Sequence, residues 1–361
     1  MPVRGKRRLL GRAPGRKDLQ QARLSEAYKH RLEKSFTVFK SWGSCKKLDV
    51  EALSGSGEEM SCALIGFIQD LYEVGGALWV GTHAVLAAQT RWRNLRGQLR
   101  PAWDSIQSWK MLVPLTPRVP LPEVLLEAIA RWAVFAALVL DPGHAPEWWC
   151  FAAVIRLGFY ALLRPKEIWN LLRSDIRMPG PRSLLREPIS VLTIREAKNR
   201  AYMGRLQIRT VRAPHASAWL AWLLDGAPSS APVWPFPASA FRRRLDQALA
   251  FFGLEASRIT PASLRAGGAT AMLEAGDSIT SIRFAGSWSS ERVLSHYLQQ
   301  AEAAAVLLDV SGPSADRIER ASRGLCFAKW PPRPSYQQVI KEWTQGTRGA
   351  SSRPPTQSSS T

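Results

Sequence analysis

The segment from Pro261 to Tyr297 constrains this chain more than any other part of the sequence. It begins with a run of small and apolar residues, S-L-R-A-G-G-A-T-A-M-L, which predicts a helix over Ser263–Ala275 with Arg265 inside it. An unpaired charge in such a helix would be costly, so Arg265 requires an anion as its partner. A short helix over Ile279–Ala285 follows, then Trp288, with the tyrosine nine residues beyond it. The segment therefore holds a cation, an indole donor and a phenol in a fixed order.

The charge of the chain predicts an anionic partner. Lysine and arginine number 49 against 29 acidic residues, which gives a formal net charge of +20. Because each cation placed on a phosphate releases a counterion, an excess of this size favours binding to nucleic acid. No run is long and apolar enough to predict a membrane span. An acidic membrane surface would also attract the charge, but no amphipathic basic helix stands out, so a membrane is not expected as a partner. The four cysteines and five histidines show no metal-ligand spacing, so no metal site is expected, and Cys150 is predicted to be a buried thiol.

Four regions are predicted along the 361 residues. Residues 1–52 form a basic, partly helical arm, and residues 53–116 form a helical domain. Residues 117–312 form a larger domain, and the Pro/Ser/Arg-rich residues 313–361 are predicted to be a disordered tail. The basic run at the start is consistent with a nuclear address, a DNA-contacting arm or an organelle transit peptide.

Hydrophobic periodicity predicts a mainly α fold, with α+β character in the larger domain. The predicted helices cover residues 19–39, several within 58–110, and then Glu123–Leu140, Trp148–Ala161, Ala238–Phe252 and Ser290–Leu308. β-branched residues alternate with other side chains over 189–196 and 206–211, which predicts one small hairpin with Lys198 near its tip.

Basic residues surround Trp92 in the predicted helical domain. These cations are Arg91, Arg93, Arg96 and Arg100. Such a pattern suits a domain that lies on a nucleic-acid backbone, and a solvated face around a core tryptophan explains it equally well.

A second arginine, Arg164, ends an apolar run with the sequence F-Y-A-L-L-R-P-K-E-I. Glu167 follows three residues later, a spacing at which its carboxylate can brace either the guanidinium or the following backbone. Two arginines far apart in the sequence can together grip both non-bridging oxygens of a phosphate. Trp288 would add one N–H donor, and Tyr297 would supply a nucleophile once its proton is removed.

Together these motifs resemble the catalytic domain of the tyrosine recombinases, the phage-integrase superfamily. In that family an arginine with an acidic residue at plus three precedes a hairpin lysine, a His-x-x-Arg motif, a Gly-His or Gly-Trp pair, and a tyrosine nine residues after that aromatic. The matching positions are Arg164, Glu167, Lys198, Arg265, Trp288 and Tyr297. The resemblance covers Leu121–Leu308, and it implies that the helical domain ahead is a core-binding domain that closes a clamp around DNA.

The resemblance implies DNA strand cleavage and rejoining, as in site-specific recombination or integration by mobile elements. Tyr297 would attack a phosphodiester and leave a 3′-phosphotyrosyl bond with a free 5′-hydroxyl. Arg164, Arg265 and Trp288 would stabilise the phosphorane, and Lys198 would protonate the departing oxygen. No metal or other cofactor is implied. The implied partners are double-stranded DNA and further copies of the chain, as a dimer or tetramer on DNA, in the nucleus of a eukaryote or otherwise in the cytoplasm or nucleoid.

Two positions depart from the family pattern. Ala262 stands where the family has the histidine of His-x-x-Arg, which touches the scissile phosphate, and Ser287 separates the glycine from Trp288. Because Ala262 has no polar side chain, reduced activity is expected, and a domesticated DNA-binding protein without the chemistry is the main competing interpretation. Two further interpretations are a type IB topoisomerase-like activity and an RNA-binding helical protein with a chance motif match.

Overall fold

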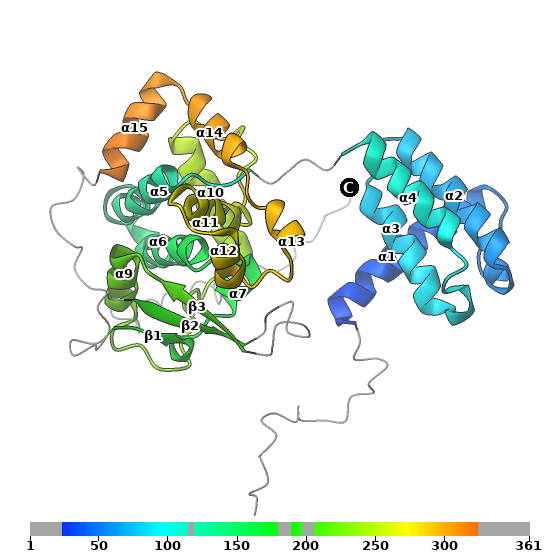
Figure 1. Ribbon diagram of the computed structural model, residues 1–361, viewed down its shortest axis with the longest axis horizontal. Helices are drawn as coiled ribbons and strands as arrows, with labels where there is room; N and C mark the ends of the chain where they lie inside the picture. Colours follow the sequence, from blue (N-terminus) through cyan, green and yellow to red (C-terminus); the bar gives the residue numbers. More distant parts are fainter. Residues whose placement is uncertain (1–23, 115–118, 180–188, 196, 198–205, 324–361) are drawn as a thin grey trace, which may run out of the picture. The chain divides into compact units, whose positions relative to one another are not determined.

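The computed structural model describes residues 24–114, 119–179, 189–195, 197 and 206–323. The chain divides into two compact units, residues 1–116 and residues 117–361. Helices dominate both units, and the second also holds one small antiparallel sheet, which agrees with the predicted mainly α fold (Figure 1).

The first unit is a helical bundle around one apolar core. Its helices are α1 (Glu26–Cys45), α2 (Gly57–Glu73), α3 (Leu78–Arg91) and α4 (Arg100–Leu112), with short 3-10 turns at η2 (Ala52–Gly55) and η3 (Arg93–Leu95). Helix α1 packs against α3 and buries Phe36 and Phe39 in this core. The predicted boundary at residue 52 is therefore wrong, because α1 belongs to the bundle rather than to a separate arm.

The second unit is built around one buried helix, α6 (Ala145–Tyr160), which Figure 1 shows among its neighbours. Helices that pack against it include α5 (Glu123–Phe135), α9 (Pro214–Leu224), α10 (Ala238–Phe251) and α11 (Ser263–Glu274). Almost every residue of α6 is apolar and buried, as expected of a helix surrounded on all sides.

Shorter elements complete the second unit. They are the π-helical turn η4 (Ala136–Leu140), η5 (Pro142–His144), α7 (Pro165–Trp169), η6 (Arg173–Asp175), α12 (Ile279–Gly286), α13 (Glu291–Ser295), α14 (Gln300–Leu308) and α15 (Gly312–Ser322). None of the helices in the described part of the chain has the length and apolar character needed to cross a bilayer.

The sheet has the antiparallel order β1-β2-β3. Its strands are β1 (Ile176–Arg177), β2 (Ser190–Ile194) and β3 (Gln207–Val211). The predicted hairpin is thus confirmed, and the two-residue strand β1 adds an edge that the sequence did not predict. In β3 the residues Gln207, Arg209 and Val211 are buried while Ile208 is 65% exposed. The strand therefore turns an arginine inward and an isoleucine outward.

Two predicted elements differ in the structure. The expected single helix over Ser290–Leu308 is two helices, α13 and α14, and Tyr297 lies in the turn between them. The expected disordered tail begins with the helix α15, whose Ile318 and Ala321 are buried against the core of the second unit. The rest of the predicted tail, residues 324–361, lies outside the described residues.

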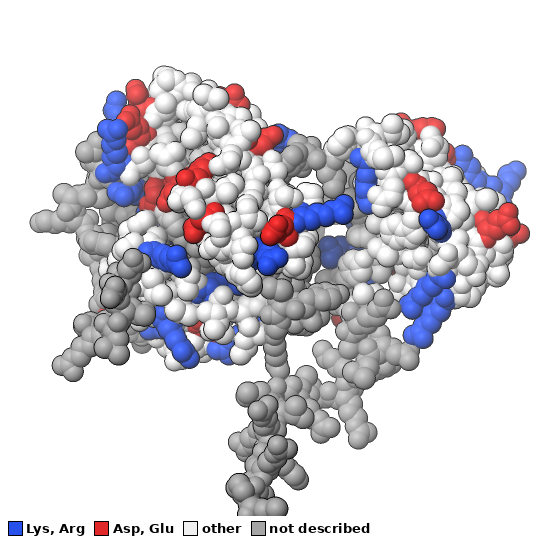
Figure 2. Space-filling view, viewed as in Figure 1, with Lys and Arg blue, Asp and Glu red and all other residues white. Residues whose placement is uncertain are grey.

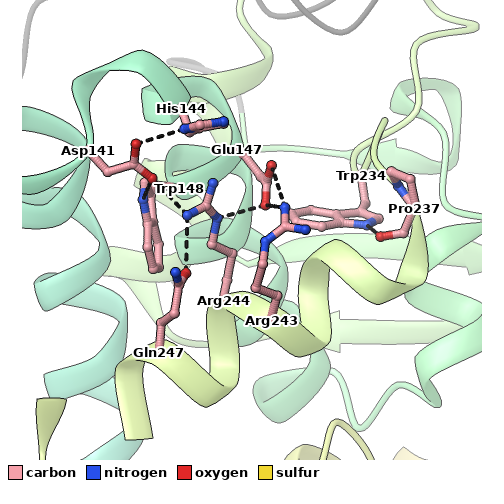
Figure 3. A network of polar contacts seen from close by, with 9 residues as sticks. All are labelled: Asp141, His144, Glu147, Trp148, Trp234, Pro237, Arg243, Arg244 and Gln247. Atoms are coloured by element: carbon pink, nitrogen blue, oxygen red, sulfur yellow. Dashed lines mark hydrogen bonds and ion pairs between the residues drawn. The ribbon is translucent and has the colours of Figure 1, made fainter. Parts of the chain in front are cut away.

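Ion pairs neutralise two buried arginines of this unit. Arg244 on α10 donates to Glu147 at 2.7 Å and to Asp141 at 2.8 Å, which joins α10 to the start of α6 (Figure 3). Arg156 on α6 donates through Nη2 to Glu127 at 2.7 Å. A buried guanidinium in this fold can thus be compensated by carboxylates, as the cost of burying a charge requires.

Candidate active site

Arg164 is held by Glu167 at the start of α7. The Arg164 backbone N–H donates to Glu167 Oε2 at 2.9 Å, and Arg164 Nη1 donates to Glu167 Oε1 at 2.6 Å. The carboxylate therefore braces both the backbone and the guanidinium, where the sequence left the choice between them open. Glu167 is buried, and the side chain of Arg164 is 22% exposed. The guanidinium of Arg164 therefore reaches the surface while the buried carboxylate holds it in place.

Arg265 is buried on α11, and its acceptors are carbonyl oxygens. Nη1 donates to the Leu162 carbonyl and Nη2 donates to the Gly286 carbonyl at 2.7 Å, while Nε has no acceptor among the described residues. These bonds join α11 to the chain after α6 and to the end of α12. In contrast to Arg244, Arg265 forms no ion pair with any carboxylate in the described ranges. Its positive charge is therefore not compensated by direct contact with an acid of this part of the chain.

Arg209 is a third arginine of the site, and the sequence motifs did not reveal it. It is buried on β3, where Nη1 donates to Ser287 Oγ at 2.6 Å and Nη2 donates to the Gly286 carbonyl at 3.2 Å. The Gly286 oxygen thus accepts hydrogen bonds from both Arg209 and Arg265, which places the two guanidinium groups side by side. Arg209 also forms no ion pair within the described part of the chain.

The three arginines repel one another within a partly desolvated site. Burial lowers the pKa of Arg265 to about 9, and the charge of Arg164 is the next cause of the shift. Burial also lowers the pKa of Arg209 to about 10, with Glu167 opposing that shift. Both groups remain protonated at neutral pH, so three cations lie near the carboxylate of Glu167. An added anion would stabilise this arrangement.

Arg265 lies against two aromatic rings, those of Trp288 and Tyr297. Its guanidinium carbon is 4.1 Å from the centroid of the Trp288 ring and 5.7 Å from that of Tyr297. The two rings are 5.1 Å apart at an interplanar angle of 61°. Trp288 is buried, and its Nε1 donor has no acceptor among the described residues. The structure thus gathers an arginine, an unused indole N–H and a phenol from three separate segments.

The turn that carries Tyr297 is tethered to α11. Thr270 Oγ1 donates to the Tyr297 carbonyl at 3.2 Å, and the Tyr297 N–H donates to the Leu294 carbonyl at 2.7 Å. Since Thr270 and Arg265 lie on the same helix, α11 fixes the phenol relative to the buried cation. Tyr297 is half-buried, so its ring is packed while the residue keeps access to solvent.

Ala262 is the N-cap residue of α11 and makes no side-chain capping bond. It is partly exposed, and it contributes no polar atom beyond its backbone. Lys198, the predicted general acid, lies outside the described residues. No group of three histidine, cysteine or acidic side chains in the described ranges could hold a metal ion.

The basic residues predicted around Trp92 are held within the first unit. Arg91 pairs with Glu33 at 3.5 Å and with Glu51 at 3.6 Å, and Trp92 packs against the core of the bundle. Arg96 donates to the Gln89 carbonyl at 3.2 Å, while Arg93 and Arg100 are exposed. Figure 2 shows lysine and arginine in separate groups on the face in view, interspersed with acidic and uncharged residues. Trp92 is thus partly buried at the edge of the core, and contact between the surrounding arginines and nucleic acid stays a prediction.

Comparisons with known proteins find similarity among solved structures. No family model matches the chain, and no curated protein matches it. A crystal structure of XerA recombinase is 15% identical, covering 84% of this chain and 94% of that one, with a TM-score of 0.38. XerH site-specific recombinase bound to difH substrate, a pre-cleavage complex, is 14% identical over 69% of this chain and 70% of that one, with a TM-score of 0.43.

A post-cleavage complex of XerH with palindromic difH substrate is likewise 14% identical, covering 69% of this chain and 72% of that one, with a TM-score of 0.45. At these identities the likeness concerns the fold alone. All three of these solved structures are of recombinases.

Proposed function

We propose that this protein cleaves and rejoins DNA strands through a 3′-phosphotyrosyl intermediate, as a tyrosine recombinase does. The observation that carries the proposal is the buried Arg265, whose partners among the described residues are carbonyl oxygens rather than carboxylates, and which stacks on Trp288 beside Tyr297. Elsewhere in the same unit the chain compensates a buried arginine with acids. No acid in the described ranges contacts Arg265 directly, and the nearby Glu167 already pairs with Arg164, so we infer that an anion from outside the chain completes the compensation.

A phosphodiester fits this site better than a carboxylate ligand does. It offers two non-bridging oxygens to the arginine forks and a third, esterified oxygen that can leave. Burial and the charge of Arg164 lower the pKa of both Arg265 and Arg209, so this cluster would gain most from the extra negative charge that develops on a phosphorane. The donor of Trp288 adds a neutral hydrogen bond to the same anion.

The proposed reaction transfers the phosphoryl group from the 5′-oxygen of DNA to the Tyr297 oxygen. The Tyr297 oxygen attacks phosphorus as its proton passes to solvent water, and the bond from phosphorus to the 5′-oxygen breaks. That 5′-oxygen takes up a proton, for which Lys198 is the proposed donor. Attack by a 5′-hydroxyl on the phosphotyrosine reverses the step and rejoins a strand. Ala262 offers no imidazole to the phosphate or to the phenol proton, so we expect slow cleavage.

A DNA-binding protein that has lost the chemistry is the second candidate, and Ala262 is the observation that favours it. The two functions are separated by trapping on nicked duplexes, whose cleavage releases a short strand and prevents rejoining. Wild type and Ala262→His are incubated with a library of such duplexes and resolved on a denaturing gel. We expect adducts with both proteins, and a rate roughly 10² to 10⁴ higher for Ala262→His, the range for general acid–base catalysis.

The possible outcomes distinguish the candidates. Adducts with Ala262→His alone would support the DNA-binding descendant. Adducts with neither protein, together with tighter binding to RNA than to duplex DNA, would contradict both and favour an RNA-binding protein. Relaxation of supercoiled plasmid without a second site would indicate topoisomerase-like activity.

The N-terminal charges are expected to dominate the salt dependence of DNA binding. Residues 1–23 carry eight lysines or arginines and a single aspartate. Replacing Arg4, Lys6, Arg7 and Arg8 with glutamine should therefore flatten the slope of log K against log salt by roughly one for each phosphate that is no longer neutralised, about 2 to 4 in total. Fluorescence anisotropy across a salt series measures the slope. Deletion of the uncharged residues 357–361 is the control, and an unchanged slope in the glutamine variant would place the phosphate contacts elsewhere.

A further inference from the structure

Arg209 occupies a position that the alternation of β3 would give to an apolar residue. Ile208 is exposed and Arg209 is buried, so the strand faces its charged side chain into the protein. A buried guanidinium without an ion pair destabilises a fold unless its other partners or a ligand compensate it. Such violations of local pattern are expected at functional sites.

The guanidinium of Arg209 is occupied by protein acceptors at both terminal nitrogens. Nη1 donates to Ser287 Oγ at 2.6 Å and to the Ile208 carbonyl at 3.2 Å, while Nη2 donates to Gln207 Oε1 at 3.1 Å and to the Gly286 carbonyl at 3.2 Å. Only the Nε of Arg209 has no acceptor among the described residues. Its four hydrogen bonds to protein acceptors suit a residue that holds other groups in place.

The group it holds is the turn between α12 and Trp288. Ser287 has φ 49°, the left-handed region that non-glycine residues adopt only at a cost. A Cβ on Gly286 would lie 1.6 Å from the Trp288 ring, so the ring packs directly over this glycine. The conformation of the turn therefore decides where the indole lies, and Arg209 contacts both residues that define it.

We propose that Arg209 is a positioning residue, which clamps the Gly286–Ser287 turn and thereby holds the Trp288 indole against Arg265. The catalytic part of this inference rests on the proposed function, since the indole donor matters for chemistry only if a phosphate binds there. The placement of Trp288 in the free protein is independent of that function. Ser287, the residue between Gly286 and Trp288, therefore has a structural role: its hydroxyl accepts the hydrogen bond through which Arg209 holds the turn.

Three variants distinguish the proposed hold of Arg209 on the turn from an effect of its charge alone and from a general loss of stability. Ser287→Gly removes the hydroxyl acceptor at a position whose φ suits glycine, so relief of the backbone strain offsets part of the lost hydrogen bond and we expect the fold to be kept. Arg209→Lys keeps the charge but loses the planar fork that reaches two acceptors. Arg209→Gln removes both the charge and the fork.

The first readout is the position of the indole, measured by fluorine NMR of the full chain labelled with 5-fluorotryptophan. The Trp288 resonance is assigned by its loss in Trp288→Phe. We expect Arg209→Gln and Ser287→Gly each to shift or broaden this resonance, and to leave resonances of the first unit, such as that of Trp109, unchanged. An unmoved Trp288 resonance in both variants would overturn the proposal.

The second readout is the rate of adduct formation on the nicked duplexes, with duplex affinity measured alongside. We expect Arg209→Gln to lower the rate about 10- to 100-fold and Ser287→Gly about tenfold at unchanged affinity, because misplacement of a catalytic group by about 1 Å has effects of this size. Full rescue by Arg209→Lys would show that charge alone matters and would overturn the clamp. If wild type forms no adduct, the proposed function fails, while the fluorine resonance still decides whether Arg209 places Trp288.

Discussion

Replacement of Tyr297 by phenylalanine is expected to lower covalent adduct formation by roughly 10⁴-fold or more, the scale of removing a catalytic nucleophile. The ring remains, so its packing 5.1 Å from Trp288 and near Arg265 is kept. The backbone bond from Thr270 to residue 297 is also kept. The variant should therefore unfold at the same denaturant concentration as wild type and bind duplex DNA with the same affinity.

The measurement is the yield of protein–DNA adduct against time on a denaturing gel. Tyr72→Phe is the matched control, because Tyr72 lies on α2 of the first unit and its replacement removes a phenol far along the chain from the site. We expect Tyr72→Phe to form adducts at the wild-type rate. Adducts of normal yield from Tyr297→Phe would show that another residue is the nucleophile.

Replacement of Gly268 by alanine is expected to destabilise the second unit by roughly 3 kcal/mol or more, at the upper end of the effects of overpacking. A Cβ at Gly268 would lie 2.1 Å from the Phe159 carbonyl oxygen and 2.7 Å from Leu162 Cδ2. A backbone oxygen at the end of α6 cannot withdraw as a flexible side chain can, so α11 would have to move. Arg265 lies on this helix and donates to the Leu162 carbonyl, so the movement would also displace the buried cation.

Chemical denaturation followed by far-UV circular dichroism measures this change. Gly143→Ala is the control in the same unit, since a Cβ there meets no atom within 4 Å, and its effect should stay within about 0.5 kcal/mol. If Gly268→Ala is as stable as Gly143→Ala, the close approach of α11 to α6 is not required for the fold.

Local patterns predict most helices and the hairpin correctly, because apolar spacing is set within each element. They do not reveal the break between α13 and α14, because residues 296–299, H-Y-L-Q, contain no glycine or proline. The turn is instead stabilised from a distance, by Thr270. Composition alone predicts that the residues of α15 belong to a disordered tail. Pro313 nevertheless lies in the first turn of this helix, a position where proline is a recognised signal of a helix start.

The site can be predicted only in part for a similar reason. Arg164, Arg265, Trp288 and Tyr297 each stand in a local motif that can be found along the sequence. Arg209 has no such motif, and the apolar neighbour Ile208 predicts the opposite face of β3 to be buried. The hydroxyl that accepts from Arg209 lies 78 residues away in the chain. Arg209 and Ser287 become neighbours only when folding brings the sheet and the end of α12 together.

Mapping the covalent bond by mass spectrometry identifies the residue that is joined to DNA. Trypsin cleaves after Arg292 and Arg317, and the peptide Val293–Arg317 between them contains Tyr297 as its single tyrosine. An adduct trapped on a nicked duplex is digested with nuclease and trypsin, and the modified peptide is fragmented. We predict a nucleotide remnant attached through phosphate to Tyr297. A remnant on any other residue, or a trapped adduct in which this peptide is unmodified, would contradict it.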